Sequence, residues 1–196
     1  GIRMEHVSYG YEGRARALQD VSLTIPKGSV VALVGLSGCG KSTTASLLMR
    51  FCDAAAGHIY MDGKDYHSMK PEELRKHIAM VPQQVNLFSG TIRENLLLAD
   101  PDADDQTLME AVKEAGLLKF VQSLEKGLNS DVGNAGASLS GGQRQKIGIA
   151  RALLSKAEYM IFDEATSSVD PESEKEIWDT ISRLAHTRTL IIISHR

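Results

Sequence analysis

The sequence predicts an α/β fold with a largely parallel sheet. Short aliphatic runs of strand length alternate with segments whose apolar residues recur every three or four positions, which is the spacing of a helix. A glycine-rich segment beginning at Gly35 follows one of the runs directly. The 196 residues, 42% hydrophobic and 24% charged, have the size and balance of one ordinary domain with a sizeable core.

The predicted elements follow in chain order from these patterns. Aliphatic or β-branched runs predict strands at 4–9, 17–25, 29–34, 58–61, 77–81, 158–162 and 189–193. A turn at 26–28, Pro-Lys-Gly, separates the second strand from the third. Helical spacing is clearest at 108–115, 147–154 and 177–185, so the middle third is expected to be mostly helical. Asp170 before Pro171 predicts a helix start, with an N-cap and a proline at the first helical position.

Composition excludes several classes of protein. The longest apolar runs, 30–34 and 190–193, are far shorter than the roughly 20 residues of a membrane-spanning helix. Two cysteines, Cys39 and Cys52, cannot form a disulfide framework or a zinc site, and no secretory segment opens the chain, so a reducing cytosolic setting is expected. With 22 basic and 25 acidic side chains and no basic block, nucleic acid is not an expected partner.

The segment 35–42, Gly-Leu-Ser-Gly-Cys-Gly-Lys-Ser, has the pattern of a phosphate-binding loop. It stands between a predicted strand and a helical segment, as such a loop requires. Glycines let successive N–H groups point at phosphate oxygens, and the start of the next helix adds its positive dipole end. Lys41 is expected to reach the β- and γ-phosphates, and the Ser42 hydroxyl to bind the Mg²⁺ that bridges them.

A second candidate site lies at the end of the predicted strand 158–162, where Asp163 and Glu164 follow an apolar run. Open α/β sheets bind ligands at the carboxyl ends of their strands. Asp163 can hold Mg²⁺ directly or through water, and Glu164 can orient or deprotonate the attacking water. A solvated strand end is the alternative for this pair, and the phosphate loop argues against it.

The segment 139–143, Leu-Ser-Gly-Gly-Gln, followed by an amphipathic helix, resembles the signature of the ATP-binding cassette (ABC) family. Its serine and two glycines at a helix start suit a γ-phosphate. The resemblance covers nearly the whole chain and implies a P-loop NTPase core with a mixed or parallel sheet, an N-terminal antiparallel β subdomain and an inserted α-helical subdomain. It divides the domain into a core at 1–82 and 157–196 and a helical part at 83–156. Because Arg196 comes directly after an apolar strand and a histidine, the domain is expected to continue past it.

The resemblance also assigns roles to single residues. Tyr11, with Tyr9 as the alternative, matches the aromatic residue that stacks on adenine. Gln83 matches a glutamine that touches Mg²⁺ and water, and His195 matches the switch histidine that contacts the γ-phosphate. The loop Ser167–Asp170 matches a dimer contact. The full implied ATP site comprises Tyr11, Gly35, Ser37, Gly38, Cys39, Gly40, Lys41, Ser42, Thr43, Ser140, Gly141, Gly142 and Gln143, with Glu164, His195, Gln83 and Lys41 catalytic and Ser42, Gln83 and Asp163 on the metal.

In the resembled family each ATP lies between the phosphate loop of one domain and the signature of another. The expected partners are therefore a second nucleotide-binding domain, as a homodimer or heterodimer, and a transmembrane domain with coupling helices. The segment 87–95, Leu-Phe-Ser-Gly-Thr-Ile-Arg-Glu-Asn, is similar to exporter-type cassettes, which implies ATP-driven export at the cytoplasmic face of a membrane. Asn134 and Ala135 replace a usual charged pair in the loop before the signature.

Three alternatives remain at this stage. One is a soluble cassette ATPase acting on DNA, although about 55 residues between Gln83 and Leu139 leave no room for a coiled-coil insertion. Another is the ATPase subunit of an importer. The last is a binding module that does not hydrolyse ATP, against which the complete set of catalytic residue types argues.

Overall fold

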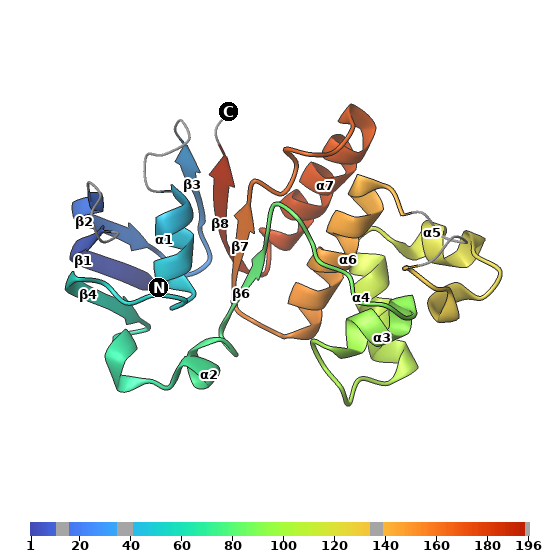
Figure 1. The fold of residues 1–196 in the computed structure, drawn as a ribbon, viewed down its shortest axis with the longest axis horizontal. Coiled ribbons are helices and arrows are strands. Elements are labelled where there is room, and N and C mark those ends of the chain that lie inside the picture. The colour runs from blue at the N-terminus through green and yellow to red at the C-terminus, as the bar shows by residue number, and fades with distance from the viewer. Residues whose placement is uncertain (11–15, 35–40, 134–138, 195–196) are drawn as a thin grey trace. The chain divides into compact units, whose positions relative to one another are not determined.

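The computed structural model describes residues 1–10, 16–34, 41–133 and 139–194 (Figure 1). The described strands are β1 Ile2–Gly10, β2 Arg16–Ile25, β3 Val30–Val34, β4 Ala56–Met61, β5 Lys64–Asp65, β6 Ile78–Val81, β7 Tyr159–Asp163 and β8 Thr189–Ser194. The helices are α1 Lys41–Leu48, α2 Pro71–Leu74, α3 Ile92–Leu97, α4 Asp105–Glu114, α5 Leu118–Ser123, α6 Gly141–Leu154 and α7 Pro171–Leu184, with 3₁₀ turns η1 Tyr66–Ser68 and η2 Gly127–Asn129.

These residues form two compact units. The first contains Gly1–Met80, Ala157–Glu164 and Ala185–Arg196, and the second contains Val81–Lys156 and Ala165–Leu184. The division of the domain that the family resemblance implies, with its helical part at 83–156, stays a prediction.

The described strands form two four-stranded sheets, which lie in the first unit except for Val81, the last residue of β6. One has the order β2-β1-β4-β5 with antiparallel pairing, and the other has the order β3-β8-β7-β6, in which β8 runs parallel to both β3 and β7 (Figure 1). Buried side chains from both sheets and from α1 join in one core, with members such as Met4, Ile25, Leu47, Ile59, Ile161 and Ile191. The predicted α/β fold with an antiparallel N-terminal part is confirmed.

The turn at 26–28 forms because Gly28 adopts a φ of 82°, which glycine takes without steric cost, and Ser29 N–H donates to the Pro26 carbonyl at 3.1 Å. This turn sets β3 in register beside β8, with Val30 opposite Leu190 and Val34 opposite Ser194. The register matters for the site, because it brings the carboxyl ends of both strands to one edge.

Helix α6 is the centre of the second unit. Its side chains are buried along most of its length, from Gly142 to Leu154, and it packs against α3, α4 and α7. Helix α7 begins as predicted, with the Asp170 carboxylate accepting from the Ser173 N–H at 3.1 Å. A hydrogen bond to the Ser173 side chain, and then this backbone bond, hold the Asp170 pKa below its ordinary value. None of the helices in the described part of the chain combines the length and apolar character that a membrane crossing requires.

Candidate nucleotide-binding and catalytic site

The predicted phosphate loop has the flanks that it needs. Strand β3 ends at Val34 and helix α1 begins at Lys41, so the loop joins a strand to a helix. Thr43 is buried on α1, at 5% exposure. The predicted loop residues Gly35, Ser37, Gly38, Cys39 and Gly40 lie outside the described residues, as do Tyr11 and His195.

The strand register places Asp163 at the same sheet edge as the loop. Asp163 of β7 pairs with Ile193 of β8, while Val34 of β3 pairs with Ser194 on the other side of β8. Two strand spacings, about 10 Å in total, therefore separate the backbone of β7 from the strand that enters the phosphate loop. A carboxylate at this strand end lies within the reach of a nucleotide bound at that edge.

Glu164 has a constrained backbone. Its φ of 50° lies in the left-handed region, and its N–H donates to the Ile193 carbonyl at 2.9 Å. A left-handed conformation in a residue other than glycine costs roughly 1–3 kcal/mol and tends to occur at functional sites. The chain therefore turns sharply after β7 while the backbone of Glu164 stays fixed to β8. Asp163 and Glu164 are both half-buried.

The signature forms the start of α6, as the sequence indicates. Ser140 is the N-cap: its Oγ accepts from Gln143 N–H at 3.1 Å, and its own N–H donates to Gln143 Oε1 at 2.9 Å. This capping box satisfies two backbone donors with side chains. It leaves the first N–H groups of the helix, at Gly141 and Gly142, without acceptors inside the helix, which is the arrangement that binds an anion.

The two signature glycines differ in their surroundings. Gly141 is exposed, so nothing but solvent hinders the approach of a ligand to one side of its backbone. Gly142 is buried, and a Cβ added to it would lie 2.4 Å from Oγ and 2.5 Å from Cβ of Ser173 on α7. Close packing of α6 against α7 thus requires the second glycine, independently of any phosphate.

A groove in the second unit brings several predicted residues together. It has a volume of about 400 Å³ and is lined by Gln83, Gln84, Val85, Asn86, Gly141, Arg144, Gln145, Ser168 and Val169. The predicted glutamine, the exposed signature glycine and the predicted dimer-contact loop thus share one depression in the surface. Gln83 itself is exposed on this groove.

Sequence reasoning assigned no role to Gln145, although the structure does. Its side chain is 4% exposed, and its Nε2 donates to the Gln83 carbonyl in a short hydrogen bond. Its Oε1 is buried and has no hydrogen-bond partner among the described residues. Gln145 ties the backbone of Gln83 to the signature helix. The sequence did hold a signal for this role: Gln145 lies on the same helix face as the buried Ile149 and Ala152, four and seven residues further along.

The segment similar to exporter cassettes carries an exposed aromatic side chain, and hydrogen bonds hold the backbone beside it. Phe88 is 60% exposed, while its N–H is held by Oδ1 of the buried Asn95 at 2.8 Å. Arg151 donates to the same Asn95 oxygen at 2.7 Å and lies 5.9 Å from the Phe88 ring centroid. The loop before the signature is bonded to the same segment, since Val132 N–H donates to the Gly90 carbonyl at 2.9 Å. Residues 134–138 lie outside the described residues.

A strand, a phosphate-loop sequence and a helix, with an acidic strand end beside them in a parallel sheet, define a P-loop nucleotide-binding domain. Comparisons with known proteins narrow this class. The family model described as "ABC transporter" matches residues 18–167. The chain therefore belongs to the ABC transporter family.

Individual relatives agree with this assignment. The chain is 47% identical to an ABC-type transporter of Curvularia clavata and 45% identical to the ATP-dependent lipid A-core flippase of Haemophilus ducreyi, with all of the chain matched in both. A bacterial Atm1-family ABC exporter solved with ATP bound superposes with a TM-score of 0.90 at 37% identity over the whole chain. The chain spans 15% of the first of these proteins and 34% of the other two.

These findings confirm the predicted family. They favour neither the importer nor the DNA-acting alternative, since the named relatives include a flippase and an exporter. The roles of single residues stay predictions.

Proposed function

We propose that this chain binds Mg-ATP and hydrolyses it to drive export of a substrate across a membrane. The observation that carries the proposal is the end of β7. Asp163 is the last residue of this strand and Glu164 follows it, in the same sheet as the strand that enters the phosphate loop. The signature at the start of α6 supplies a second anion site.

The nucleotide would be held mainly by backbone N–H groups. The loop 35–40 and the start of α1 would surround the β- and γ-phosphates, with Lys41 as the positive charge, and Tyr11 would stack on the adenine ring. The exposed start of α6, at Ser140 and Gly141, would receive the γ-phosphate of a nucleotide bound to another copy.

The residues present fit Mg²⁺. This ion prefers oxygen ligands and is usually held by one or two carboxylates together with the phosphates and water. Asp163 provides a half-buried carboxylate at the required sheet edge, and Ser42 and Gln83 are the other proposed oxygen donors. When bound, Mg²⁺ would neutralise charge that develops on the transferred phosphoryl group.

Glu164 would act on the attacking water. Its fixed backbone supports this role, because a water-positioning group must be held in place before the reaction begins. Gln83 would contact the same water and Mg²⁺, and His195 would contact the γ-phosphate. Gln145 would keep the backbone of Gln83 in position.

The relatives support export as the work that hydrolysis drives. The matched proteins are three to seven times longer than this chain and include a lipid A-core flippase and a putative multidrug export protein of Bacillus subtilis. We infer a transmembrane partner domain whose coupling helices meet the surface around Phe88, and a location at the cytoplasmic face of a membrane. A second nucleotide-binding domain would complete each ATP site.

The substitution Glu164→Gln tests the catalytic assignment. The amide is nearly isosteric with the carboxylate but cannot accept the proton of the water, so hydrolysis is expected to fall by roughly 10²- to 10⁴-fold. ATP affinity is expected to stay within a few-fold of wild type. Steady-state ATPase rates measured beside nucleotide dissociation constants would decide, and turnover close to that of wild type would refute the role of Glu164.

Glu158→Gln is the matched control. Glu158 precedes the opposite end of β7 and lies 3.7 Å from Lys27 and 3.9 Å from His77 in partly exposed ion pairs. Glu158→Gln makes the same change of charge as Glu164→Gln, but at the other end of the same strand. We expect its ATPase rate to stay within about twofold of wild type, because exposed ion pairs contribute little to stability.

A further inference from the structure

The C-terminal end of helix α1 is closed by an unusual residue. Phe51 N–H donates to the Ser46 carbonyl at 2.8 Å and Arg50 N–H to the Leu47 carbonyl at 3.0 Å, which together form a Schellman motif. The left-handed position of that motif is normally a glycine, and here it is Arg50, with a φ of 55°. An arginine in this conformation carries backbone strain that glycine would not.

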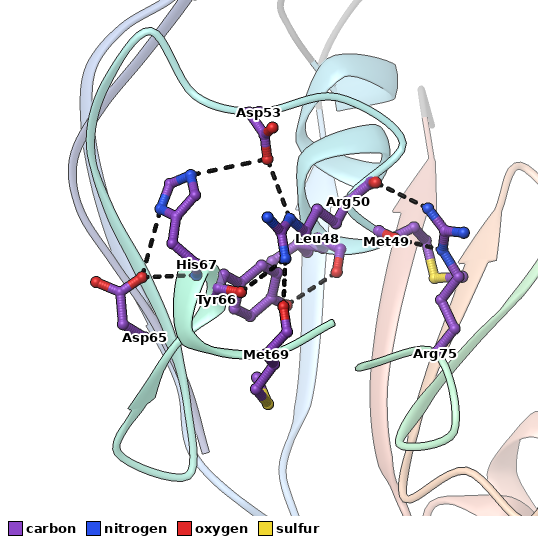
Figure 2. Close-up of polar contacts among 9 residues, drawn as sticks. All are labelled: Leu48, Met49, Arg50, Asp53, Asp65, Tyr66, His67, Met69 and Arg75. Carbon is purple, nitrogen blue, oxygen red and sulfur yellow. Dashed lines mark hydrogen bonds and ion pairs between the residues drawn. The ribbon is translucent and has the colours of Figure 1, made fainter. Parts of the chain in front are cut away.

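Side chains from residues 66–75 satisfy the next three carbonyls of the chain. Tyr66 Oη donates to the Leu48 carbonyl at 2.8 Å, Arg75 Nε donates to the Met49 carbonyl at 3.1 Å, and Arg75 Nη2 donates to the Arg50 carbonyl at 2.8 Å (Figure 2). Every carbonyl from Ser46 to Arg50 therefore has a donor. The end of α1 is fixed by a segment that is distant from it in sequence.

Arg50 binds that segment in return. Its Nη1 donates to the carbonyls of Tyr66 at 2.9 Å and Met69 at 2.6 Å, and its Nε donates to Asp53 at 3.1 Å (Figure 2). These bonds explain how the structure holds an arginine at a position suited to glycine. We call Arg50, Tyr66 and Arg75 the helix clamp.

The clamp residues are themselves held in place. Tyr66 is 3% exposed and belongs to η1, which Asp65 caps by accepting from the His67 N–H at 2.8 Å. That bond holds the pKa of Asp65 below its ordinary value. The Arg75 guanidinium lies 5.0 Å from the ring centroid of Phe51. Both guanidinium groups also lie at the negative end of the helix dipole.

We propose that the helix clamp positions the phosphate loop, and so sets the affinity for the phosphates of ATP. Helix α1 has eight residues and a length of about 12 Å, so it moves as one rigid rod between the clamp and the loop that precedes Lys41. A shift of its C-terminal end would move the N–H groups at its start relative to bound phosphate. This inference rests on the proposed ATP-binding function, in which Arg50, Tyr66 and Arg75 are positioning residues.

The experiment compares Tyr66→Phe, Arg75→Gln and Arg75→Lys with wild type. Tyr66→Phe removes one hydrogen-bond donor and keeps the ring. Arg75→Lys keeps the positive charge but cannot donate to the Met49 and Arg50 carbonyls through two nitrogens at once. The dissociation constant for Mg-ATP and the KM are expected to rise about 3- to 10-fold for Tyr66→Phe, the size of one net hydrogen bond, and more for Arg75→Gln. The kcat is expected to stay within about twofold of wild type in all three variants. The dissociation constant of Arg75→Lys is expected to lie between those of wild type and Arg75→Gln.

Arg3→Gln is the matched control. Arg3 lies 4.8 Å from the Tyr60 ring centroid, much as Arg75 lies over Phe51, and pairs with Glu5, but it has no bond to α1 among the described residues. It makes the same change of charge and loses the same kind of ring contact. Its Mg-ATP dissociation constant is expected to equal that of wild type.

Arg50→Gly separates positioning from simple stability. It relieves the left-handed strain but removes the guanidinium and its three hydrogen bonds. The dissociation constant, measured well below the midpoint of thermal unfolding so that all molecules are folded, is expected to rise at least 3-fold. A purely structural role would instead lower the folded fraction and leave the dissociation constant of folded molecules unchanged. Unchanged dissociation constants in Tyr66→Phe, Arg75→Lys and Arg50→Gly would overturn the clamp proposal, whereas a wild type that neither binds nor hydrolyses ATP would overturn the proposed function itself.

Discussion

At the scale of single residues, the site depends on backbone positions that are unfavourable in isolation. Glu164 and Arg50 both have left-handed φ angles, of 50° and 55°. In each case hydrogen bonds to neighbouring elements hold the conformation: Ile193 for Glu164, and Tyr66 and Met69 for Arg50. Strain of this kind persists only where the surrounding structure fixes it. Both residues border the elements that we assign to the phosphates of ATP.

The two cysteines are expected to react at different rates. Burial raises the pKa of the Cys52 thiol, which reduces its thiolate fraction at neutral pH. Cys39 belongs to the phosphate-loop sequence next to a helix start and Lys41, a setting that favours thiolate. We therefore predict that an alkylating reagent labels Cys39 first and that Mg-ATP slows this labelling.

Peptide mass mapping after timed alkylation at pH 7 would measure both rates. Cys52→Ser serves as the control, because it should leave the inactivation rate unchanged. Faster labelling of Cys52, or equal labelling of Cys39 with and without nucleotide, would contradict the prediction.

At the scale of elements, the long strands were predictable and the short helices were not. Each predicted strand lies within two residues of an observed one, because aliphatic runs of this length leave few alternatives in an α/β protein. Helices α2, α3 and α5 have four to six residues, too few for a helical period to be visible. The sequence Thr91 to Glu94 did contain a readable signal, a capping box that starts α3.

The site was predictable where its signal is local and hidden where it depends on distant residues. The phosphate loop, the acidic pair and the signature are contiguous patterns. The bond from Gln145 to Gln83 joins residues 62 positions apart, and the bond from Arg75 to Met49 joins residues 26 apart. No sequence period encodes such pairings, so only the folded structure shows them.

The packing of α6 against α7 provides a sharp test at this scale. Gly142→Ala would place Cβ 2.5 Å from Ser173 Cβ, a contact that rotation of the serine hydroxyl cannot relieve. We predict a loss of about 1–3 kcal/mol in the free energy of unfolding, as for other overpacked sites. Urea denaturation would measure it.

A double-mutant cycle identifies the cause. Ser173→Gly should restore most of the stability lost in Gly142→Ala, whereas Ser173→Ala should not, because alanine keeps the Cβ. Gly133→Ala is the control, since its nearest neighbour would lie 3.6 Å away. A failure of Ser173→Gly to couple with Gly142→Ala would show that the loss comes from elsewhere.

At the scale of the whole molecule, one chain contains two proposed anion sites on different elements. The phosphate loop leads into α1, and the signature starts α6, whose exposed Gly141 shares a groove with Gln83 and the 167–170 loop. Hydrolysis by a lone chain would leave the signature without a nucleotide. Sharing each ATP between two copies gives both sites a ligand, and is what the family resemblance implies.

We therefore predict that the specific ATPase activity rises with protein concentration, because closure depends on mass action between associating copies.

Mixing two inactive variants tests the sharing directly. Lys41→Ala removes the charge of the phosphate loop. Ser140→Asp places a negative charge against the γ-phosphate while it keeps an N-cap residue, so α6 should still start normally. In a dimer of one copy of each, one composite site has two intact halves and the other has none. Activity of the mixture above the sum of the separate variants would support sharing. A specific activity that is independent of concentration, together with a mixture that stays inactive where wild type turns over, would show that each chain hydrolyses ATP alone.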